Sequence, residues 1–513
     1  MEQNKILKTI LVISVIILSF SLLIGLGIIL SENVIAVSGS VKSASSKTIK
    51  IDFNSKIRTL PLELIGIFGQ PYLSQIPDKN FEESYKKLKE AGIYMVDLQI
   101  ITDEKDPKIP YFTDFNADAE KEENYDFTSI DKRVKAAVNN GLKIQLSVDD
   151  INKAPSDYDK YGKIVEHLIK HLIEGWADGF KLTSSDIRLV IYANEPDLVI
   201  TTPQGEKVQA FWQGTSDEFN KSYVAFAKAV KSVNKDLPVG GPAYAFPVSE
   251  TNNVVGDSVN DYVVTFLDHV KENGAPLDYF SWHRYGFNPG EFSKTMKVIK
   301  TEIAKYSTLS PLYGTPKIAS DEWDMAMGIG GRGPQLKGLT NAWGAAARLS
   351  NLIAMTRNGL GASTLASGFE ANIIKSNGSS TPSFYMFKGL SKLKEANILL
   401  SSSEGDGKGF DAMSVKSEDG KKVVIFISNF NANKYEEKIG LKKSANASYR
   451  TSYDISLANL PWSGKKVSYS RYVIDDSNNF KLSESAILKG GKKMNISEKI
   501  AMPQIQVIVL SVK

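Results

Sequence analysis

Two glutamates, Glu195 and Glu322, stand where strand-like runs of apolar residues come to an end. Glu195 closely follows the run at 187–193, and Glu322 lies in the last part of the run at 316–323. A single acid at the end of a strand is common and is usually a solvated loop residue. Two such acids on parallel strands of one barrel would face each other at the mouth, where barrels of this kind carry their active sites. A carboxyl pair can cleave a glycosidic bond, because one group protonates the leaving oxygen while the other attacks the anomeric carbon.

The part of the chain that must position this pair shows short apolar runs alternating with helical stretches. The strand-like runs lie at 62–69, 93–100, 142–148, 187–193, 238–244, 278–285, 316–323 and 361–368. Helices are expected at 80–91, 131–140, 156–174, 216–234, 258–273 and 339–356. Strands that alternate with helices indicate parallel β/α units. We therefore expect residues 51–375 to form a catalytic (β/α)₈ TIM barrel of the α/β class, with a doubly wound open sheet as the alternative.

The remaining residues, 376–513, have a different character. Clusters of Gly, Asn, Asp and Ser separate strand-like runs, without a convincing long helix, and these runs lie at 422–430, 465–474 and 504–512. This pattern predicts an all-β sandwich as an accessory domain. The run KTIKIDF at 47–53 is also strand-like, and we expect it to pair with this domain.

The N-terminal segment is apolar and free of charge from Ile10 to Leu30. About 20 apolar residues suffice to span a bilayer, so we expect residues 1–36 to form an N-terminal signal anchor, a transmembrane helix. Lys5 and Lys8 precede the apolar segment, which places the N-terminus in the cytoplasm and the catalytic body outside the cell membrane. Cleavage near residue 36, giving a secreted protein, is the alternative. Residues 37–50 are rich in serine and are expected to form a flexible linker.

The composition excludes several function classes. The 513 residues carry a net charge of only +4 without a long basic run, so the chain lacks the electrostatic footprint of a nucleic-acid-binding protein. The chain has no cysteine, which excludes disulfides, thiolate metal sites and cysteine nucleophiles.

Two weaker patterns do not suggest a cofactor. His167 and His171 are four residues apart on an expected helix, a spacing that could chelate a metal, but no partner at a recognised spacing accompanies them. Residues 328–333 match G-x-G-x-x-G, but the acidic residue that a dinucleotide site needs about 20 positions later is absent. We expect structural histidines, a loop beside the active site, no metal and no organic cofactor.

Several short motifs resemble glycoside hydrolase family 39, a family within the clan of retaining (β/α)₈-barrel glycosidases. Ala193-Asn194-Glu195-Pro196 and Asp321-Glu322-Trp323 look like the acid/base and nucleophile motifs of that clan. Further motifs similar to those of the family are Phe211-Trp212-Gln213-Gly214-Thr215, Tyr223, Lys231-Ser232-Val233, Gly240-Gly241-Pro242-Ala243 and Ser281-Trp282-His283-Arg284-Tyr285. These specific motifs cover only about residues 120 to 325.

The resemblance implies a role for each of these residues. Glu195 would be the general acid and then the general base, and Glu322 the nucleophile that forms a glycosyl-enzyme ester. Asn194 would bind the sugar 2-hydroxyl, Tyr285 would donate a hydrogen bond to Glu322, and His283 would orient the acid/base or bind sugar. Three tryptophans would stack on sugar faces, with plain core packing as the alternative: Trp212, Trp282 and Trp323.

The chain departs from the family on two strands. The Arg and His expected on the second strand are absent, and the third strand ends without a familiar signature. Candidate specificity residues at these places, with solvated loop positions as the alternative, are Asp97, Gln99, Asp149 and Asp150.

Together with the glutamate pair, the resemblance implies a retaining glycoside hydrolase that cleaves β-glycosidic bonds in an oligosaccharide or polysaccharide, β-xylosidase-like or polysaccharide-degrading. The alternatives are a catalytically inactive carbohydrate-binding protein of the cell surface and a transglycosylase.

Overall fold

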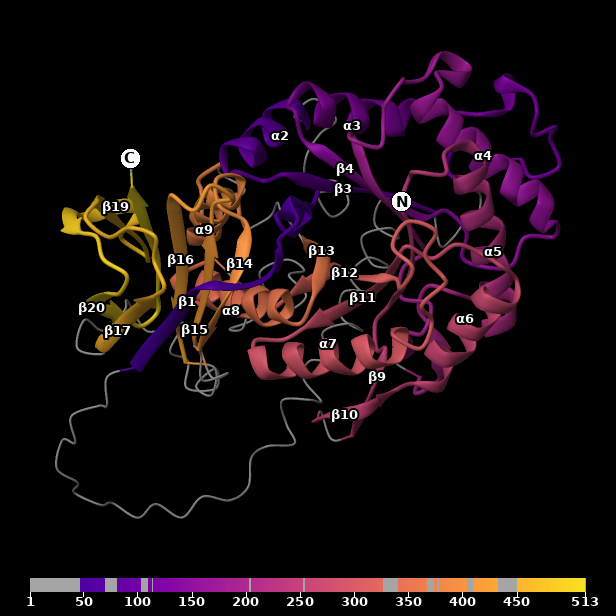
Figure 1. Cartoon of the computed structure of the whole chain (residues 1–513). Helices are drawn as coiled ribbons and strands as arrows, with labels where there is room; N and C mark the ends of the chain where they lie inside the picture. Colours follow the sequence, from indigo (N-terminus) through magenta and orange to yellow (C-terminus); the bar gives the residue numbers. More distant parts are fainter. Residues whose placement is uncertain are drawn as a thin grey trace.

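The structure is a computed structural model, and it describes residues 47–512 apart from 70–80, 103–108, 113, 203, 252–253, 326–339, 367–372, 376–377, 404–408 and 432–449. Eight parallel strands form a closed barrel in the order β11-β12-β13-β2-β3-β4-β5-β8 (Figure 1). Their bounds are β2 (Gly66–Phe68), β3 (Met95–Ile101), β4 (Lys143–Asp149), β5 (Ile187–Tyr192), β8 (Val239–Tyr244), β11 (Tyr279–Tyr285), β12 (Lys317–Asp324) and β13 (Leu360–Leu365). All eight overlap the runs expected from the sequence, and closure of the barrel shows that the open-sheet alternative is wrong.

Helices surround the barrel strands (Figure 1). They are α2 (Phe81–Glu90), α3 (Thr128–Asn139), α4 (Tyr158–Ile173), α5 (Ser216–Val233), α6 (Asp261–Glu272), α7 (Pro289–Ile303) and α8 (Ala342–Arg357). Local sequence sets several of their starts. Before α5, for example, Thr215 and Glu218 form a reciprocal capping box that satisfies free N–H groups of the first turn. Two short hairpins are inserted after β5 and β8, namely β6 (Val199–Thr201) with β7 (Lys207–Gln209), and β9 (Val248–Thr251) with β10 (Val254–Val259).

The C-terminal part is rich in β-sheet, as expected. Nine strands form one sheet in the order β19-β18-β21-β16-β15-β14-β1-β17-β20. Their bounds are β1 (Lys47–Thr59), β14 (Ile398–Ser403), β15 (Phe410–Lys416), β16 (Lys422–Asn429), β17 (Arg450–Ala458), β18 (Lys466–Ile474), β19 (Asn479–Lys489), β20 (Met494–Ala501) and β21 (Gln504–Val512). The expected pairing of the N-terminal run is confirmed, because β1 lies between β14 and β17. Residues 51–59, which we grouped with the barrel, therefore belong to this sheet.

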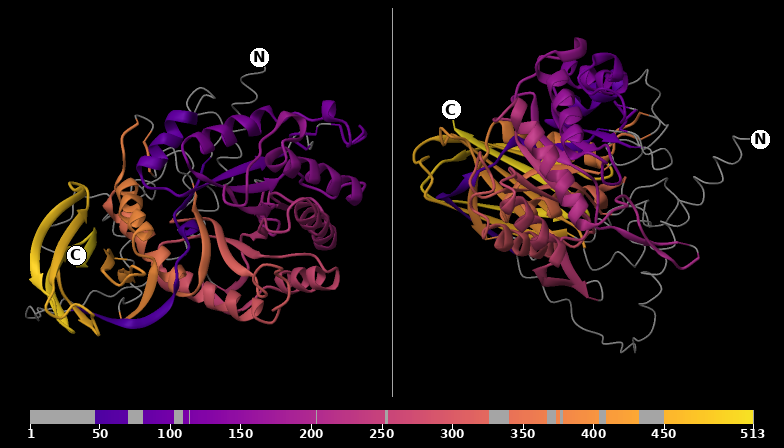
Figure 2. Two further views of the ribbon diagram at one scale, coloured as in Figure 1. Left: turned by 45° about the horizontal axis from the view of Figure 1, so that its top comes forward. Right: turned by 90° about the vertical axis from the view of Figure 1, so that its right-hand side faces the viewer.

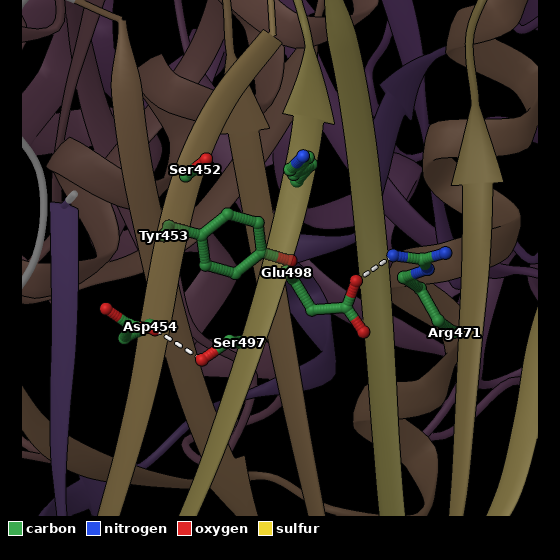
Figure 3. A pocket seen from close by; sticks show the side chains of 7 residues that line it. Ser452, Tyr453, Asp454, Arg471, Ser497 and Glu498 are labelled. Atoms are coloured by element: carbon green, nitrogen blue, oxygen red, sulfur yellow. Dashed lines mark hydrogen bonds and ion pairs between the residues drawn. The ribbon is translucent and has the colours of Figure 1, made fainter. Parts of the chain in front are cut away.

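The two ends of the nine-stranded sheet meet. Arg471 of β18 pairs with the carboxylate of Glu498 on β20, although these strands lie near opposite ends of the strand order (Figure 3). The hydroxyl of Tyr469, also on β18, donates a hydrogen bond to the same carboxylate. Ser497 of β20 donates a hydrogen bond to Asp454 of β17 at 2.6 Å. The yellow C-terminal strands lie on the side of the domain away from the barrel (Figure 2). The sheet thus folds over and encloses its own apolar core, to which β1 contributes Ile49 and Ile51.

The barrel and the sheet share an interface built largely by helices. The helix α9 (Pro382–Leu390) lies in the region for which the sequence predicted strands and turns only. This short helix begins at Pro382, a residue type favoured at the first helical position, and it packs with α8 against the sheet. Hydrogen bonds cross the interface as well, since Ser428 Oγ donates to the carbonyl of Ala346 at 2.7 Å.

A buried ion pair joins the seventh barrel strand to this interface. Arg348 of α8 donates to both carboxylate oxygens of Asp324 at 2.8 and 3.1 Å and to Ser383 of α9 at 2.7 Å. Arg348 is 0 % and Asp324 1 % exposed. Removing one partner of such a pair leaves an uncompensated charge in the interior.

We predict that Arg348→Met lowers the free energy of unfolding by about 3–5 kcal/mol, measured by urea denaturation. Lys221→Met is the matched control, because Lys221 pairs with Asp217 at 2.6 Å on an exposed helix surface, where ion pairs contribute little. A loss no larger than that of the control would show that the buried pair does not stabilise the interface.

Three sequence-based expectations lie outside the described residues. They are the N-terminal anchor, most of the serine-rich linker and the glycine-rich loop at 328–333. Within the part of the chain that the structure describes, no helix is both long and apolar enough to cross a bilayer.

Candidate active site

The end of the fourth barrel strand places Glu195 in a strained turn. Ala193 and Glu195, which follow β5, and Ala243 at the end of β8 have positive φ values of 69°, 43° and 56°. Such conformations are unfavourable for residues with a Cβ and persist where the surroundings impose them, often at functional sites. Here the backbone N–H of Glu195 donates to the carbonyl of Ala243 at 3.0 Å. The turn is thereby fixed to the neighbouring strand, and Glu195 is 7 % exposed.

The sixth and seventh barrel strands bring three further predicted residues to the same place. Parallel pairing of β11 with β12 sets His283 opposite Glu322. The hydroxyl of Tyr285, two residues further along β11, donates a hydrogen bond to Oε1 of Glu322. This is the contact that the resemblance implied for Tyr285.

His283 lies between the two glutamates. Its Nδ1 is 2.9 Å from Oε1 of Glu195 and 3.8 Å from Oε2 of Glu322, so these two carboxylate oxygens are at most about 6.7 Å apart, the sum of the two distances. Retaining glycosidases hold their carboxyl groups about 5–5.5 Å apart, and inverting ones hold them about 6.5–9.5 Å apart. The geometry therefore admits the retaining arrangement.

The second nitrogen of His283 also faces an acid. Nε2 lies 3.5 Å from Oδ2 of Asp321, the residue before Glu322. Burial alone would lower the pKa of His283, but the carboxylates of Asp321 and Glu322 outweigh it and hold the pKa well above its ordinary value. An imidazolium donates from both nitrogens, which matches a ring with an acid at each nitrogen.

The carboxyl group of Glu322 is subject to opposing influences. Burial raises its pKa, as does the nearby charge of Glu195, whereas the positive charge of His283 and the hydroxyl of Tyr285 lower it. Asp97 is a further buried acid near this pair. Burial holds its pKa well above the ordinary value, and the charges of Asp321 and Glu322 add to the effect. The titrations of these neighbouring groups therefore influence one another.

We predict that Tyr285→Phe lowers kcat/KM by roughly tenfold, the size expected for losing a hydrogen bond to a charged group, and moves the acidic limb of its pH profile to higher pH. The hydroxyl stabilises ionised Glu322, so its removal raises the pKa of Glu322. A carboxylate nucleophile must be ionised. As the pH is lowered, the variant therefore loses activity at a higher pH than the wild-type chain does. The matched control is Tyr313→Phe, at an exposed tyrosine that precedes β12. An unmoved acidic limb would contradict this role.

The three tryptophans expected to stack on sugar lie in the interior. Trp212, Trp282 and Trp323 are 4 %, 0 % and 1 % exposed. The indole of Trp212 donates to the carbonyl of Thr215 at 3.1 Å, and the other two pack against Phe292. Sugar stacking by these rings stays a prediction that their burial does not favour. Asn194, expected to bind the 2-hydroxyl, is half-buried beside Glu195.

The candidate specificity residues are not solvated loop positions. Asp97, Gln99, Asp149 and Asp150 are all at least nine-tenths buried. Asp150 accepts hydrogen bonds from the hydroxyls of Tyr111 and Tyr161 at 2.6 and 2.8 Å. Burial raises the pKa of Asp150 to about 6, against these hydrogen bonds, which lower it.

The two histidines of α4 have structural partners. His171 contacts Asp131 and the carbonyl of Trp176, both at 2.8 Å, and His167 contacts the hydroxyl of Tyr125 at 3.0 Å. Both are buried, which agrees with the structural role that the sequence favoured.

Two functional neighbours were not identified from sequence. Asp321 lies close to Nε2 of His283. Asp197, in the turn of Glu195, accepts hydrogen bonds from the backbone of the segment after β8. Asp321 lies within a quoted motif and Asp197 directly follows one, so their position in sequence was the available signal. Nothing in the sequence pattern, however, showed which way their side chains point.

Comparison with known proteins gives a consistent picture. Residues 109–313 match the model of Glycosyl hydrolases family 39. A β-xylosidase from Caldicellulosiruptor saccharolyticus is 29% identical over 133 residues, which are 26% of this chain and 22% of that protein. A β-xylosidase from Geobacillus stearothermophilus is 26% identical over 194 residues, 34% of this chain and 33% of that protein. The matched stretches thus span between about a fifth and a third of these relatives' lengths.

Solved structures match over almost the whole fold. A glucosidase from Croceicoccus marinus has a TM-score of 0.66 at 21% identity, covering 91% of this chain and 99% of its own. A β-xylosidase from Caulobacter crescentus has a TM-score of 0.62 at 15% identity, with the same coverage. A family 39 enzyme from Xanthomonas axonopodis pv. citri has a TM-score of 0.61 at 13% identity, covering 93% of this chain and 99% of its own. At these identities the likeness establishes the fold.

Proposed function

We propose that this chain is a retaining glycosidase acting on β-linked sugars. Its sequence matches support glycosyl hydrolase family 39 as its family, and its fold agrees with that family. Glu195 is the acid/base and Glu322 the nucleophile. The observation that carries the proposal is the approach of both carboxylates to the same nitrogen of His283, from the ends of the fourth and seventh barrel strands. A carboxyl pair at this spacing suits double displacement.

In the first step the ionised carboxylate of Glu322 attacks the anomeric carbon. The bond from that carbon to the glycosidic oxygen breaks, and the proton of Glu195 passes to this oxygen, which leaves as an alcohol. The product on the enzyme is a glycosyl ester of Glu322. In the second step Glu195 takes a proton from water, whose oxygen attacks the same carbon and releases Glu322 as a carboxylate. Two inversions give net retention.

The position of His283 suits the first step. The ring nitrogen lies 2.9 Å from Oε1 of Glu195, so its positive charge stabilises the carboxylate that Glu195 becomes as the leaving group departs. The hydroxyl of Tyr285 holds Glu322 at the other side of the site. The two acids are therefore oriented by different residues of the same strand, β11.

The proposed substrate class is a β-xyloside, or a polysaccharide cleaved within its chain. Two curated relatives are β-xylosidases, and this supports xylose as the first sugar to test. The full chain would be incubated with aryl β-xyloside, glucoside, galactoside, arabinoside and mannoside, with Glu322→Ala as the control. Release of the aryl group from at least one glycoside, absent in the variant, is expected. Failure on all five and on polysaccharides would contradict the proposed function.

We also propose that residues 10–30 anchor the protein in the cell membrane with the catalytic body outside. The length and apolar character of this segment and the lysines before it support the proposal. Membranes from expressing cells would be washed with alkaline carbonate and then with detergent. We expect the full chain to stay in the membranes through the carbonate wash and to be released by detergent. A variant lacking residues 1–36 would instead be found in the supernatant. Release by carbonate alone would contradict anchoring.

A further inference from the structure

Phe246 is an exposed aromatic residue at the mouth of the barrel. Among the described residues the exposed aromatic ones are Phe246, at 49 %, and Tyr313, at 39 %. Tyr313 precedes β12 and thus lies at the opposite end of the barrel from the carboxyl ends of the strands. Phe246 follows β8 by two residues, so it lies at the end where Glu195 and Glu322 meet.

The acid/base turn holds Phe246 directly. Asp197, two residues after Glu195, accepts hydrogen bonds from the backbone N–H groups of Ala245 and Phe246, both at 2.8 Å. The N–H of Glu195 in turn donates to the carbonyl of Ala243. The segment that carries Phe246 therefore runs alongside the turn that carries Glu195, and backbone hydrogen bonds fix their relative position.

Two further side chains hold the segment from the other side. Asn260 donates from Nδ2 to the carbonyl of Phe246 at 2.6 Å, and the hydroxyl of Tyr262 donates to Oδ2 of Asp197 at 2.9 Å. Tyr262 also packs against Tyr244, with 4.8 Å between the ring centroids. The backbone of Phe246 is thus held on both sides while half of the residue faces solvent. An exposed side chain on a fixed backbone is preordered for a ligand, since little conformational freedom remains to be lost on binding.

Phe246 lies on the side of Glu195. Which part of the substrate binds on that side depends on the roles of the two glutamates, so this inference rests on the proposed function. The general acid protonates the oxygen of the leaving group, and the leaving group therefore lies on the side of Glu195. We propose that Phe246 is a stacking platform for the sugar ring on the leaving-group side of the scissile bond. The C–H face of a pyranose is apolar and packs on the face of an aromatic ring.

The surroundings suit a substrate with more than one sugar. The β6–β7 hairpin follows the turn of Glu195 and the β9–β10 hairpin follows Phe246, so both extend the mouth on this side. Exposed valines lie on both hairpins, namely Val199 at 43 % and Val254 at 64 %. Single exposed valines are ordinary, so the aromatic ring carries the proposal. The substrate class it indicates is a β-linked disaccharide or longer oligosaccharide.

The test compares two substrates of the full chain that share the bound sugar and differ in leaving group. One is the methyl β-glycoside, whose small leaving group cannot reach Phe246 but needs the proton of Glu195, as a sugar leaving group does. The other is the β-linked disaccharide, starting with methyl β-xyloside and β-1,4-xylobiose and otherwise using the sugar identified by the aryl panel. We expect Phe246→Ala to lower kcat/KM for the disaccharide about tenfold, the size expected for losing one well-packed contact, with kcat/KM for the methyl glycoside unchanged. Phe246→Trp keeps disaccharide turnover, and Tyr313→Ala is the matched control for loss of an exposed ring.

Each other result has a definite meaning. Equal losses on both substrates would show that Phe246 acts through the turn of Glu195 and would overturn the platform. An unchanged disaccharide kcat/KM in Phe246→Ala would overturn it as well. A wild-type chain that turns over neither substrate would contradict the proposed function itself, which separates that failure from a failure of the platform.

Discussion

Glu322→Ala is expected to lower the hydrolysis of an aryl β-glycoside by roughly 10⁴-fold or more, as loss of a catalytic nucleophile does in other enzymes. The carboxylate that would attack the anomeric carbon is then absent, and no neighbouring group takes over its position. Asp321 is the adjacent acid, but it lies at the other nitrogen of His283. Stopped assays of aryl-group release across a range of enzyme concentrations would measure the loss.

The same variant permits a second readout. Azide is small enough to enter the space left by the removed carboxylate and can attack the anomeric carbon of a substrate with a good leaving group. The expected product is the α-glycosyl azide, since one displacement replaces two. Glu206→Ala is the matched control, because Glu206 is an exposed glutamate on the β6–β7 hairpin. Activity close to that of the control, or a β-configured azide, would show that Glu322 is not the nucleophile.

Glu195→Ala is expected to lower the rate of the first step by about 10²–10⁴-fold for substrates whose leaving group needs a proton. Substrates with a dinitrophenyl leaving group need no acid, so their first step remains fast. The glycosyl-enzyme ester then accumulates, because Glu195 is also the base of the second step.

The dependence on leaving group distinguishes this role from a structural one. A series of aryl glycosides of increasing leaving-group acidity would be compared in the variant, in the wild-type chain and in Glu206→Ala. A steep dependence is expected only in Glu195→Ala. A uniform loss across the series would mean that Glu195 holds the site together without transferring a proton.

The barrel was predictable because its strands carry a strong local signal. Parallel barrel strands are buried on both faces and read as continuous apolar runs, as β3 and β5 do. The membership of β1 in the C-terminal sheet was a weaker inference, since its partners β14 and β17 lie several hundred residues away. The helix α9 was missed because nine residues show too little periodicity to distinguish a buried helix from a strand.

The place of the two glutamates at two strand ends of the barrel mouth was predictable from the sequence, but their surroundings were not. The contacts of His283 with Glu195 and Asp321 depend on side-chain direction in a twisted barrel, which sequence spacing does not give. The same is true of the tryptophans, because a strand buried on both faces offers no polar side from which to infer exposure. Phe246 carried no motif, and its significance comes from its hydrogen-bonded link to Asp197.

The most direct test of the account is to trap the covalent intermediate. A 2-deoxy-2-fluoro β-glycoside with a dinitrophenyl leaving group forms the ester quickly and releases it slowly, because the fluorine removes the 2-hydroxyl contact that strengthens in the transition state. The full chain would be inactivated with this reagent, digested and examined by peptide mass spectrometry. We predict one fluorosugar on the peptide that contains Glu322, attached to that residue. A label on any other residue, or turnover of β-glycosides without any trapped ester, would contradict it.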